Sequence, residues 1–164
     1  TGGFDEILAV YTEDLEFSLR IWLAGYQILS CPQSKVYHWT KKVEDRKKMQ
    51  ATRENIYYHL AKNTIRTILK DYSFFSVLTY LPAAFGILFY RIIVRLYMKD
   101  SSAFFGTFKG IYYILLNYRK LLQDRRLVQN DIRVVKDSEL FKKIIDQESL
   151  LTIYRKYFSK KLNR

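Results

Sequence analysis

Cysteine, proline and glycine are scarce in this chain of 164 residues, which has one Cys, two Pro and six Gly. The single cysteine, Cys31, excludes a disulfide within the chain, so a reducing compartment is the simpler expectation. The sequence also has no repeat, no low-complexity tract and no linker rich in Pro, Gly or Ser. Its length suits a single domain with a sizeable core as the starting assumption.

Basic residues are scarce before residue 40 and abundant after it, and the whole chain has a net charge of +12. Residues 1–40 contain five acidic and two basic side chains (net −3), which leaves 11 acidic and 26 basic side chains (net +15) for the remainder. A strongly basic segment suits an anionic partner, either nucleic acid or an anionic lipid surface. The charge pattern therefore predicts an acidic head and a basic, aromatic body with different roles.

The acidic head is predicted to contain one helix and two short strands. Apolar residues recur on one helical face from residue 13 to residue 24, at Leu15, Leu19, Trp22 and Leu23. Thr12 is the predicted N-cap of this helix, and Gly25 stands where a helix ends in a left-handed residue. Residues 26–31 and 35–39 are short, apolar or alternating, and are interpreted as strands.

The basic body is predicted to be mainly helical. The charged passage at residues 41–48 marks a boundary, which divides the chain into residues 1–43 and residues 44–164. A long helix is expected from about residue 44 to residue 70, followed by apolar segments at 72–90 and 103–118 and a helical tail from 137 to 164. The predicted fold class is a small α/β fragment followed by a helical region, mostly α overall.

Four motifs follow one another in the acidic head: GGFDE at residues 2–6, ED at 13–14 with Arg20, AGY at 24–26 and VYH at 36–38. In this order they resemble the acceptor-side half of the family 2 glycosyltransferases, which have a GT-A fold. The resemblance covers roughly the first 40 residues, and the helical remainder is more weakly similar to C-terminal extensions of rhamnosyltransferase-like members. Because the chain opens in the middle of a motif, we expect it to be the C-terminal part of a longer enzyme.

The resemblance implies that Asp14 is the catalytic base and that Glu13 supports it. Inverting transfer of a sugar needs a base for the acceptor hydroxyl, and a carboxylate at the positive end of a helix stays ionised. The alternative is that both carboxylates merely favour the helix N-terminus. The motifs in register on either side favour the catalytic interpretation.

The same resemblance places acceptor binding at Gly2, Gly3, Phe4 and Asp5. Glycine lets a backbone approach a sugar closely because no Cβ intervenes, although a pair of glycines also forms ordinary turns. Phe4 can stack on a sugar face or pack in a core.

The resemblance also implies that His38 helps to bind a divalent cation, Mg²⁺ or Mn²⁺, which holds the donor diphosphate. The usual carboxylate partners form an Asp-x-Asp motif, and none occurs in this sequence. The chain alone is therefore not expected to turn over donor. A lone His on an apolar strand is otherwise a core residue.

Membrane association is predicted for the basic body. Residues 72–90 carry no charge over 19 residues, about the length that spans a bilayer core, although Pro82 and several polar residues weaken the segment as a span. Two stripes of basic residues at i, i+4 and i+8 flank it: Lys62, Arg66, Lys70, Arg91, Arg95 and Lys99. They favour in-plane attachment to an anionic membrane surface. A soluble bundle with solvated charged faces is the alternative.

Together these features predict part of an inverting glycosyltransferase at the cytoplasmic face of the membrane. The resemblance implies a nucleotide-sugar donor and a glycan or lipid-linked acceptor, in the synthesis of a cell-surface polysaccharide. A non-catalytic membrane-tethering module is the second hypothesis. A nucleic-acid-binding domain is the third, and it is not favoured because no binding motif is found and the acidic head would be unexplained.

Overall fold

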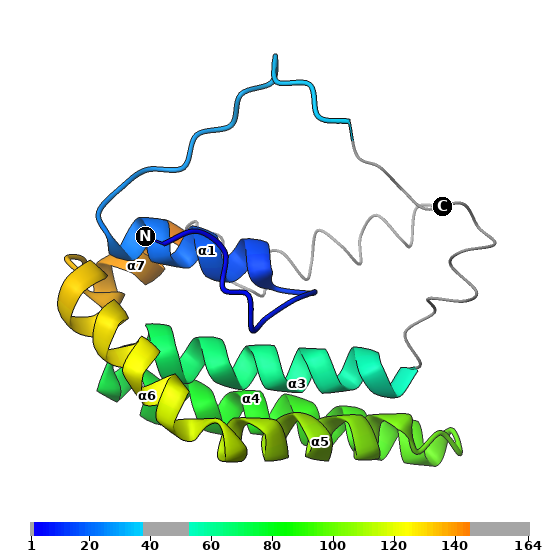
Figure 1. The fold of residues 1–164 in the computed structure, drawn as a ribbon. Helices are drawn as coiled ribbons and strands as arrows, with labels where there is room; N and C mark the ends of the chain where they lie inside the picture. Colours follow the sequence, from blue (N-terminus) through cyan, green and yellow to red (C-terminus); the bar gives the residue numbers. More distant parts are fainter. Residues whose placement is uncertain (1, 38–52, 145–164) are drawn as a thin grey trace.

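A computed structural model of the chain describes residues 2–37 and 53–144, and these form a helical protein (Figure 1). The elements in order are α1 (Glu13–Leu23), α3 (Arg53–Asp71), α4 (Phe74–Tyr97), α5 (Ser102–Leu116), α6 (Tyr118–Arg126), the π-helix η1 (Leu127–Ile132) and α7 (Asp137–Ile144). The prediction of a mostly α-helical chain is therefore confirmed. Residues 44–52 of the predicted long helix and 145–164 of the predicted tail lie outside the described residues.

The predicted strands are not found among the described residues. Residues 26–37 have an irregular backbone, and the side chains of Tyr26, Leu29 and Tyr37 are exposed. An isolated short strand is not stable, because its backbone groups and its apolar face both need a neighbouring strand or helix. The periodicity was thus insufficient to predict a strand, and the α/β part of the predicted fold class is not confirmed.

Helix α1 agrees with its prediction at both ends, and Thr12 is its N-cap by position, although its side chain does not cap the helix. It ends at Leu23, with Ala24 as the C-cap and Gly25 in the left-handed conformation at φ +84°. Thr12 has φ +64°, and its side chain makes no capping hydrogen bond. Its backbone carbonyl instead accepts the first helical hydrogen bond, from the Glu16 amide at 2.9 Å.

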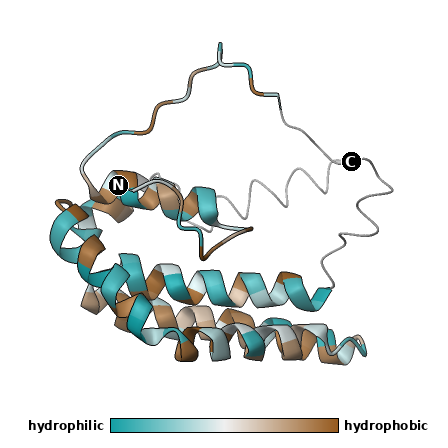
Figure 2. Ribbon diagram, in the orientation of Figure 1, coloured by the Kyte–Doolittle hydropathy of each residue, from teal (hydrophilic) through white to brown (hydrophobic). Residues whose placement is uncertain are grey.

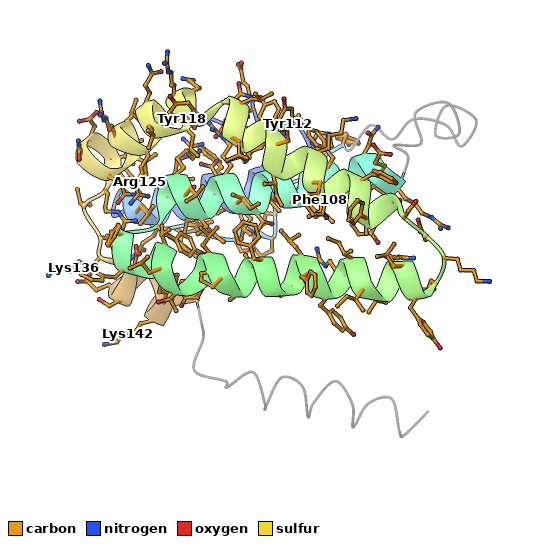
Figure 3. The ribbon with its side chains drawn as sticks, turned by 90° about the horizontal axis from the view of Figure 1, so that it is seen from below. Phe108, Tyr112, Tyr118, Arg125, Lys136 and Lys142 are labelled. Atoms are coloured by element: carbon orange, nitrogen blue, oxygen red, sulfur yellow. The ribbon has the colours of Figure 1, made fainter. Side chains whose placement is uncertain are left out.

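Helix α3 is the centre of the fold. Helices α4 and α5 lie along one side of it, and α1 lies along the other (Figures 1 and 3). One apolar cluster joins α3 to α4, α5 and α6 and contains Ala61, Ile65, Leu88, Ile114 and Leu121. A second cluster joins α1 to η1 and α7 and contains Leu19, Leu23, Val128 and Leu140.

Two glycines of α5 set its close approach to α3. A Cβ at Gly106 would overlap the carbonyl oxygen of Glu54, and a Cβ at Gly110 would lie 2.7 Å from the carbonyl oxygen of Tyr58. Small residues at a spacing of four allow two helix backbones to approach this closely. The packing of α5 on α3 therefore requires glycine at both positions.

Helices α4 and α5 present apolar side chains to the outside. Only Ala84, Leu88 and Ile92 of α4 are buried, as a stripe at i, i+4 and i+8. Figure 2 shows hydrophobic colour concentrated on α4 and α5, whereas α3 is largely hydrophilic. Within the described ranges, α4 is the one helix that is long and apolar enough to cross a membrane by length and composition. The fold thus leaves an apolar surface on the side away from α1.

Gly106→Ala is expected to destabilise the fold, because the added methyl group would push α5 away from α3. We expect a loss of about 1–3 kcal/mol in the free energy of unfolding, measured by urea denaturation. The matched control is Gly86→Ala on α4, where an added Cβ meets no atom within 4 Å. It should be neutral or stabilising by up to about 1 kcal/mol, because alanine favours a helix. Equal losses in the two variants would contradict the close-packing account.

Candidate functional site

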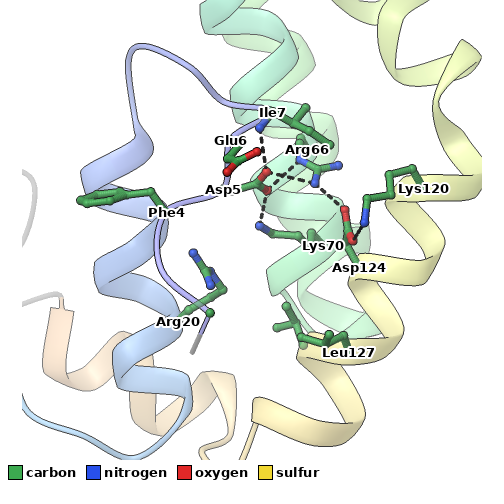
Figure 4. A pocket seen from close by; sticks show the side chains of 12 residues that line it. Phe4, Asp5, Glu6, Ile7, Arg20, Arg66, Lys70, Lys120, Asp124 and Leu127 are labelled. Atoms are coloured by element: carbon green, nitrogen blue, oxygen red, sulfur yellow. Dashed lines mark hydrogen bonds and ion pairs between the residues drawn. The ribbon is translucent and has the colours of Figure 1, made fainter.

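The carboxylate of Asp5 is bound by two cations of α3. Arg66 donates from Nε to Asp5 Oδ2 at 2.9 Å, and Lys70 donates from Nζ to the same oxygen at 2.6 Å (Figure 4). The side chains of Arg66 and Lys70 are almost completely buried. The loop that precedes α1 is therefore attached to α3 by a buried ion cluster.

A second carboxylate, Glu16 of α1, belongs to the same cluster. Lys70 Nζ donates to Glu16 Oε1, and Arg20 donates to both Glu16 oxygens. Arg20 also donates from a terminal nitrogen to the carbonyl oxygen of Gly3. Arg20 thus connects the loop that contains Gly2 and Gly3, here called the glycine loop, to α1. Lys70 connects this loop, through Asp5, and α1, through Glu16, to α3.

The cluster continues to α6 through Asp124. Arg66 reaches Asp124 Oδ2 at 2.6 Å, and Lys120 reaches Asp124 Oδ1 at 2.7 Å. We call the connected set of Asp5, Glu16, Arg20, Arg66, Lys70 and Asp124 the buried ion network. Its three cations match its three carboxylates, and the more exposed Lys120 adds a fourth cation at Asp124, so each carboxylate of the network is paired.

Asp71 lies beside the network without joining it fully. Its carboxylate is completely buried, neither oxygen accepts a hydrogen bond from a described residue, and Lys70 Nζ is 3.9 Å away. Burial raises the pKa of Asp71 well above the ordinary value, and repulsion from Glu16 and Asp5 adds to this, against attraction by Lys70 and Arg20.

The loop before α1 also makes polar contacts with residues of α3 that precede Arg66 in the helix. Lys62 donates to the carbonyl oxygen of Ile7 and lies over the rings of Tyr58 and Tyr113, at 5.4 and 5.3 Å from their centroids. The side-chain amide of Asn63 donates to carbonyl oxygens of the same loop, those of Leu8, Val10 and Tyr11. Helix α3 therefore acts as a polar support for the acidic head.

Three of the six residues predicted to form a membrane surface are placed differently from the prediction. Lys62, Arg66 and Lys70 do lie on one face of α3, as their spacing indicated, but that face is buried against the acidic head. The prediction was wrong for these three, because helical spacing identifies a shared face without identifying its partner. Arg91 and Lys99 are exposed, and Arg95 is half-buried.

The predicted base, Asp14, lies exposed in the first turn of α1. Its Oδ1 accepts a hydrogen bond from the Leu15 amide at 2.8 Å. Glu13 is half-buried, and one of its oxygens is buried without a hydrogen-bond partner among the described residues.

The predicted acceptor-binding residues divide into two groups. Gly2 and Gly3 are exposed at φ +73° and +74°, and a Cβ on either would meet no atom within 4 Å. Phe4 is exposed and packs against Phe17 at 4.8 Å between ring centroids. Asp5 has instead a structural role in the buried ion network, so its assignment to acceptor binding is not supported.

The glycine loop and the predicted base lie at different ends of α1. Arg20, which holds Gly3, follows Asp14 by six residues, or about 9 Å along a helix axis. A cavity of ≈ 330 Å³ lies at the glycine end, and its lining includes Phe4, Glu6 and Arg20 but not Asp14. The described residues therefore do not bring all the predicted site residues into one pocket.

The predicted metal ligand His38 lies outside the described residues. Within the described parts of the chain, no group of three or more His, Cys, Asp or Glu side chains is arranged to hold a metal ion. The role of His38 therefore stays a prediction.

The buried partners of Asp5 were not predicted from the sequence. The available signal was complementary charge, since the head is acidic and the stripe on α3 is basic.

Comparison with family models, characterised proteins and solved structures finds no match to this chain.

Asp5→Asn is expected to destabilise the protein at neutral pH. Burial alone would raise the pKa of Asp5, but hydrogen bonds and charge from Arg66 and Lys70 outweigh it and lower the pKa from 3.8 to about 2. The lowered pKa corresponds to on the order of 2 kcal/mol of stability that is present above pH 3.8 and lost as the pH falls towards 2. Urea unfolding of both proteins across this pH range measures the difference.

The matched control for this experiment is Glu6→Gln, which neutralises the adjacent, exposed carboxylate. It should change the free energy of unfolding by less than about 0.5 kcal/mol. A pH-independent difference between the wild type and Asp5→Asn would contradict the ion-pair assignment.

Proposed function

We propose that this chain is the acceptor-side part of an inverting glycosyltransferase, joined to a helical body that lies on a membrane. The enzyme transfers a sugar from a nucleotide-sugar donor to a glycan or lipid-linked acceptor in cell-surface polysaccharide synthesis. The observation that carries the proposal is the exposed carboxylate of Asp14 in the first turn of α1, at the position that the motif order gives to the base.

The proposed chemistry needs Asp14 to accept one proton. As the acceptor hydroxyl oxygen attacks the anomeric carbon of the donor, its proton passes to the carboxylate and the nucleoside diphosphate leaves with the electrons of the broken bond. Asp14 is exposed, so an acceptor hydroxyl can reach it, and the hydrogen bond from the Leu15 amide restrains its side chain. A restrained, accessible carboxylate suits a general base.

The rest of the acidic head supports this role by positioning. Gly2 and Gly3 offer exposed backbone for close contact with an acceptor sugar, and Arg20 restrains the carbonyl group of Gly3. The buried ion network ties both the loop and α1 to α3. The donor site and the carboxylates that bind the metal would come from polypeptide other than this chain.

The helical body is proposed to lie in the plane of the membrane. Helices α4 and α5 contain no acidic residue and expose many apolar side chains, including Phe75, Phe89 and Phe108. Helix α3 packs along both of them and carries the buried ion network, so a span by α4 would bring these charges into the bilayer. In-plane attachment places only the apolar face in lipid.

One observation bears on the competing functions. A nucleic-acid-binding domain would use the basic residues of the body, but three of the six predicted surface cations are already occupied within the chain. A membrane-tethering module without catalysis shares the proposed apolar surface. It differs from the enzyme in having no need for Asp14.

Asp14→Asn in the complete enzyme is expected to abolish sugar transfer and to leave donor binding near that of the wild type. The amide keeps the shape of the side chain but cannot accept the proton. Transfer of radiolabelled sugar to acceptor measures turnover, and isothermal titration measures donor affinity. A loss of about 10²–10⁴-fold in turnover is expected for removal of a general base.

Two variants serve as controls for Asp14. Glu13→Gln should reduce transfer less, because Glu13 only supports the base, and Asp131→Asn in η1 neutralises an exposed carboxylate that has no proposed role. Retention of most turnover by Asp14→Asn would reject Asp14 as the base and would favour the tethering module.

A second test replaces Phe75, Phe89 and Phe108 together by Ser. All three side chains are mostly exposed, so the fold should be retained, and binding to anionic vesicles should fall at least about tenfold because each ring contributes about 1–2 kcal/mol on entering lipid. Sedimentation with vesicles measures the binding.

The control replaces Tyr26, Leu29 and Tyr37 by Ser, since these exposed side chains belong to the segment on the opposite side of α3 (Figure 1). This variant should bind vesicles like the wild type. Equal loss in both variants, or no binding by the wild type, would remove the membrane surface from the proposed function.

A further inference from the structure

A groove of ≈ 610 Å³ lies between the N-terminal half of α3 and the C-terminal half of α4. Three arginines line it: Arg53 from α3, and Arg91 and Arg95 from α4. The arginines on α4 are spaced at i and i+4, so their side chains project from one face. The groove is separate from the buried ion network and from Asp14.

The positive charge of the groove is only partly neutralised. Asp100 accepts a hydrogen bond from Arg53 at 3.1 Å and lies 3.9 Å from a terminal nitrogen of Arg95. Arg95 also donates from Nε to the hydroxyl oxygen of Tyr57 at 2.6 Å. Arg91 has no hydrogen-bond or ion-pair partner among the described residues. Two guanidinium groups therefore share one carboxylate and the third has none, which leaves an excess of two positive charges.

The walls between the arginines are apolar. Ile56 and Leu60 line the groove from α3, Val94 lines it from α4, and Met98 lines it from the C-cap of that helix. The groove borders the exposed side of α4, where the side chains of Tyr90 and Tyr97 are exposed. A ligand with an anionic head and an apolar tail would match both the arginines and the surface beside them.

We infer that this groove binds the phosphate headgroup of a lipid, with the acyl or prenyl chain lying along α4. Guanidinium groups bind phosphate by paired hydrogen bonds in a planar fork, which explains the arginines, and a phosphate carries enough charge to balance the excess. The inference rests on the proposed attachment to a membrane, and it adds a site for one kind of headgroup.

The test is a titration of the full chain with dihexanoyl phosphatidic acid, below the concentration at which this lipid forms micelles. Isothermal titration calorimetry measures the binding affinity. Two control ligands are titrated separately. Inorganic phosphate has the phosphate group without the acyl chains, and dihexanoylglycerol has the acyl chains without the phosphate group. The lipid phosphate should bind at least about tenfold more tightly than either, because charge-assisted hydrogen bonds and apolar contact act together. Equal affinity for inorganic phosphate would overturn the lipid assignment and leave an anion site.

A matched pair of triple variants tests the location. Arg53→Gln, Arg91→Gln and Arg95→Gln together should weaken lipid-phosphate binding at least about tenfold. Arg119→Gln, Arg126→Gln and Lys136→Gln remove the same charge from exposed positions outside the groove and should weaken it less than about threefold. Circular dichroism melting of both variants checks that each is folded. Equal losses would show non-specific attraction and would overturn the inference.

Because the short-chain lipid is monomeric, this test is independent of bilayer binding. Vesicle sedimentation without lipid-phosphate binding would overturn the groove site and leave the proposed membrane attachment in place. Lipid-phosphate binding without vesicle sedimentation would keep the site and overturn the attachment. Failure of both would remove the lipid from the account.

Discussion

The attraction between the acidic head and helix α3 is the interaction on which the described structure depends. Asp5 and Glu16 are the carboxylates, and Arg66 and Lys70 are the cations that bind them, with all four side chains largely buried. Buried charges are costly unless they are paired, so the head and α3 are each poorly suited to exist alone in this conformation. The pairing places α1, and with it Asp14, in a defined orientation on the helical body.

That same pairing determines what the rest of the body can do. With its basic face covered by the head, α3 turns its other sides to α4 and α5, and the glycines at positions 106 and 110 allow close contact with α5. The apolar stripes of α4 and α5 that do not meet α3 then face outwards. The molecule therefore has a polar, acidic side that carries the proposed chemistry and an apolar side that suits a bilayer.

The sequence predicted the positions of the helices better than the contacts that their side chains make with distant parts of the chain. The helix from Glu13, its end just before Gly25 and the apolar helices of the body followed from periodicity and from glycine, which act within a few residues. The burial of Lys62, Arg66 and Lys70 depends on residues more than 50 positions away, and an i, i+4 pattern carries no such information. Asp5 was assigned to acceptor binding for the same reason: the resemblance identified the motif, but its carboxylate binds cations more than 60 residues away in the chain. The strands predicted for residues 26–31 and 35–39 are not confirmed over their described part, which ends at residue 37, because pairing, which the pattern cannot supply, is what stabilises a strand.

The central claim is that the acidic head takes part in transfer with inversion, and the anomeric configuration of the product tests it most directly. The complete enzyme would be incubated with a panel of nucleotide-sugars and a lipid-linked glycan acceptor, and the new linkage analysed by proton NMR. The account predicts a product whose anomeric configuration is opposite to that of the donor, as a single displacement with one carboxylate base requires. A product with the configuration of the donor, or no transfer from any donor by a folded, membrane-bound enzyme, would contradict it.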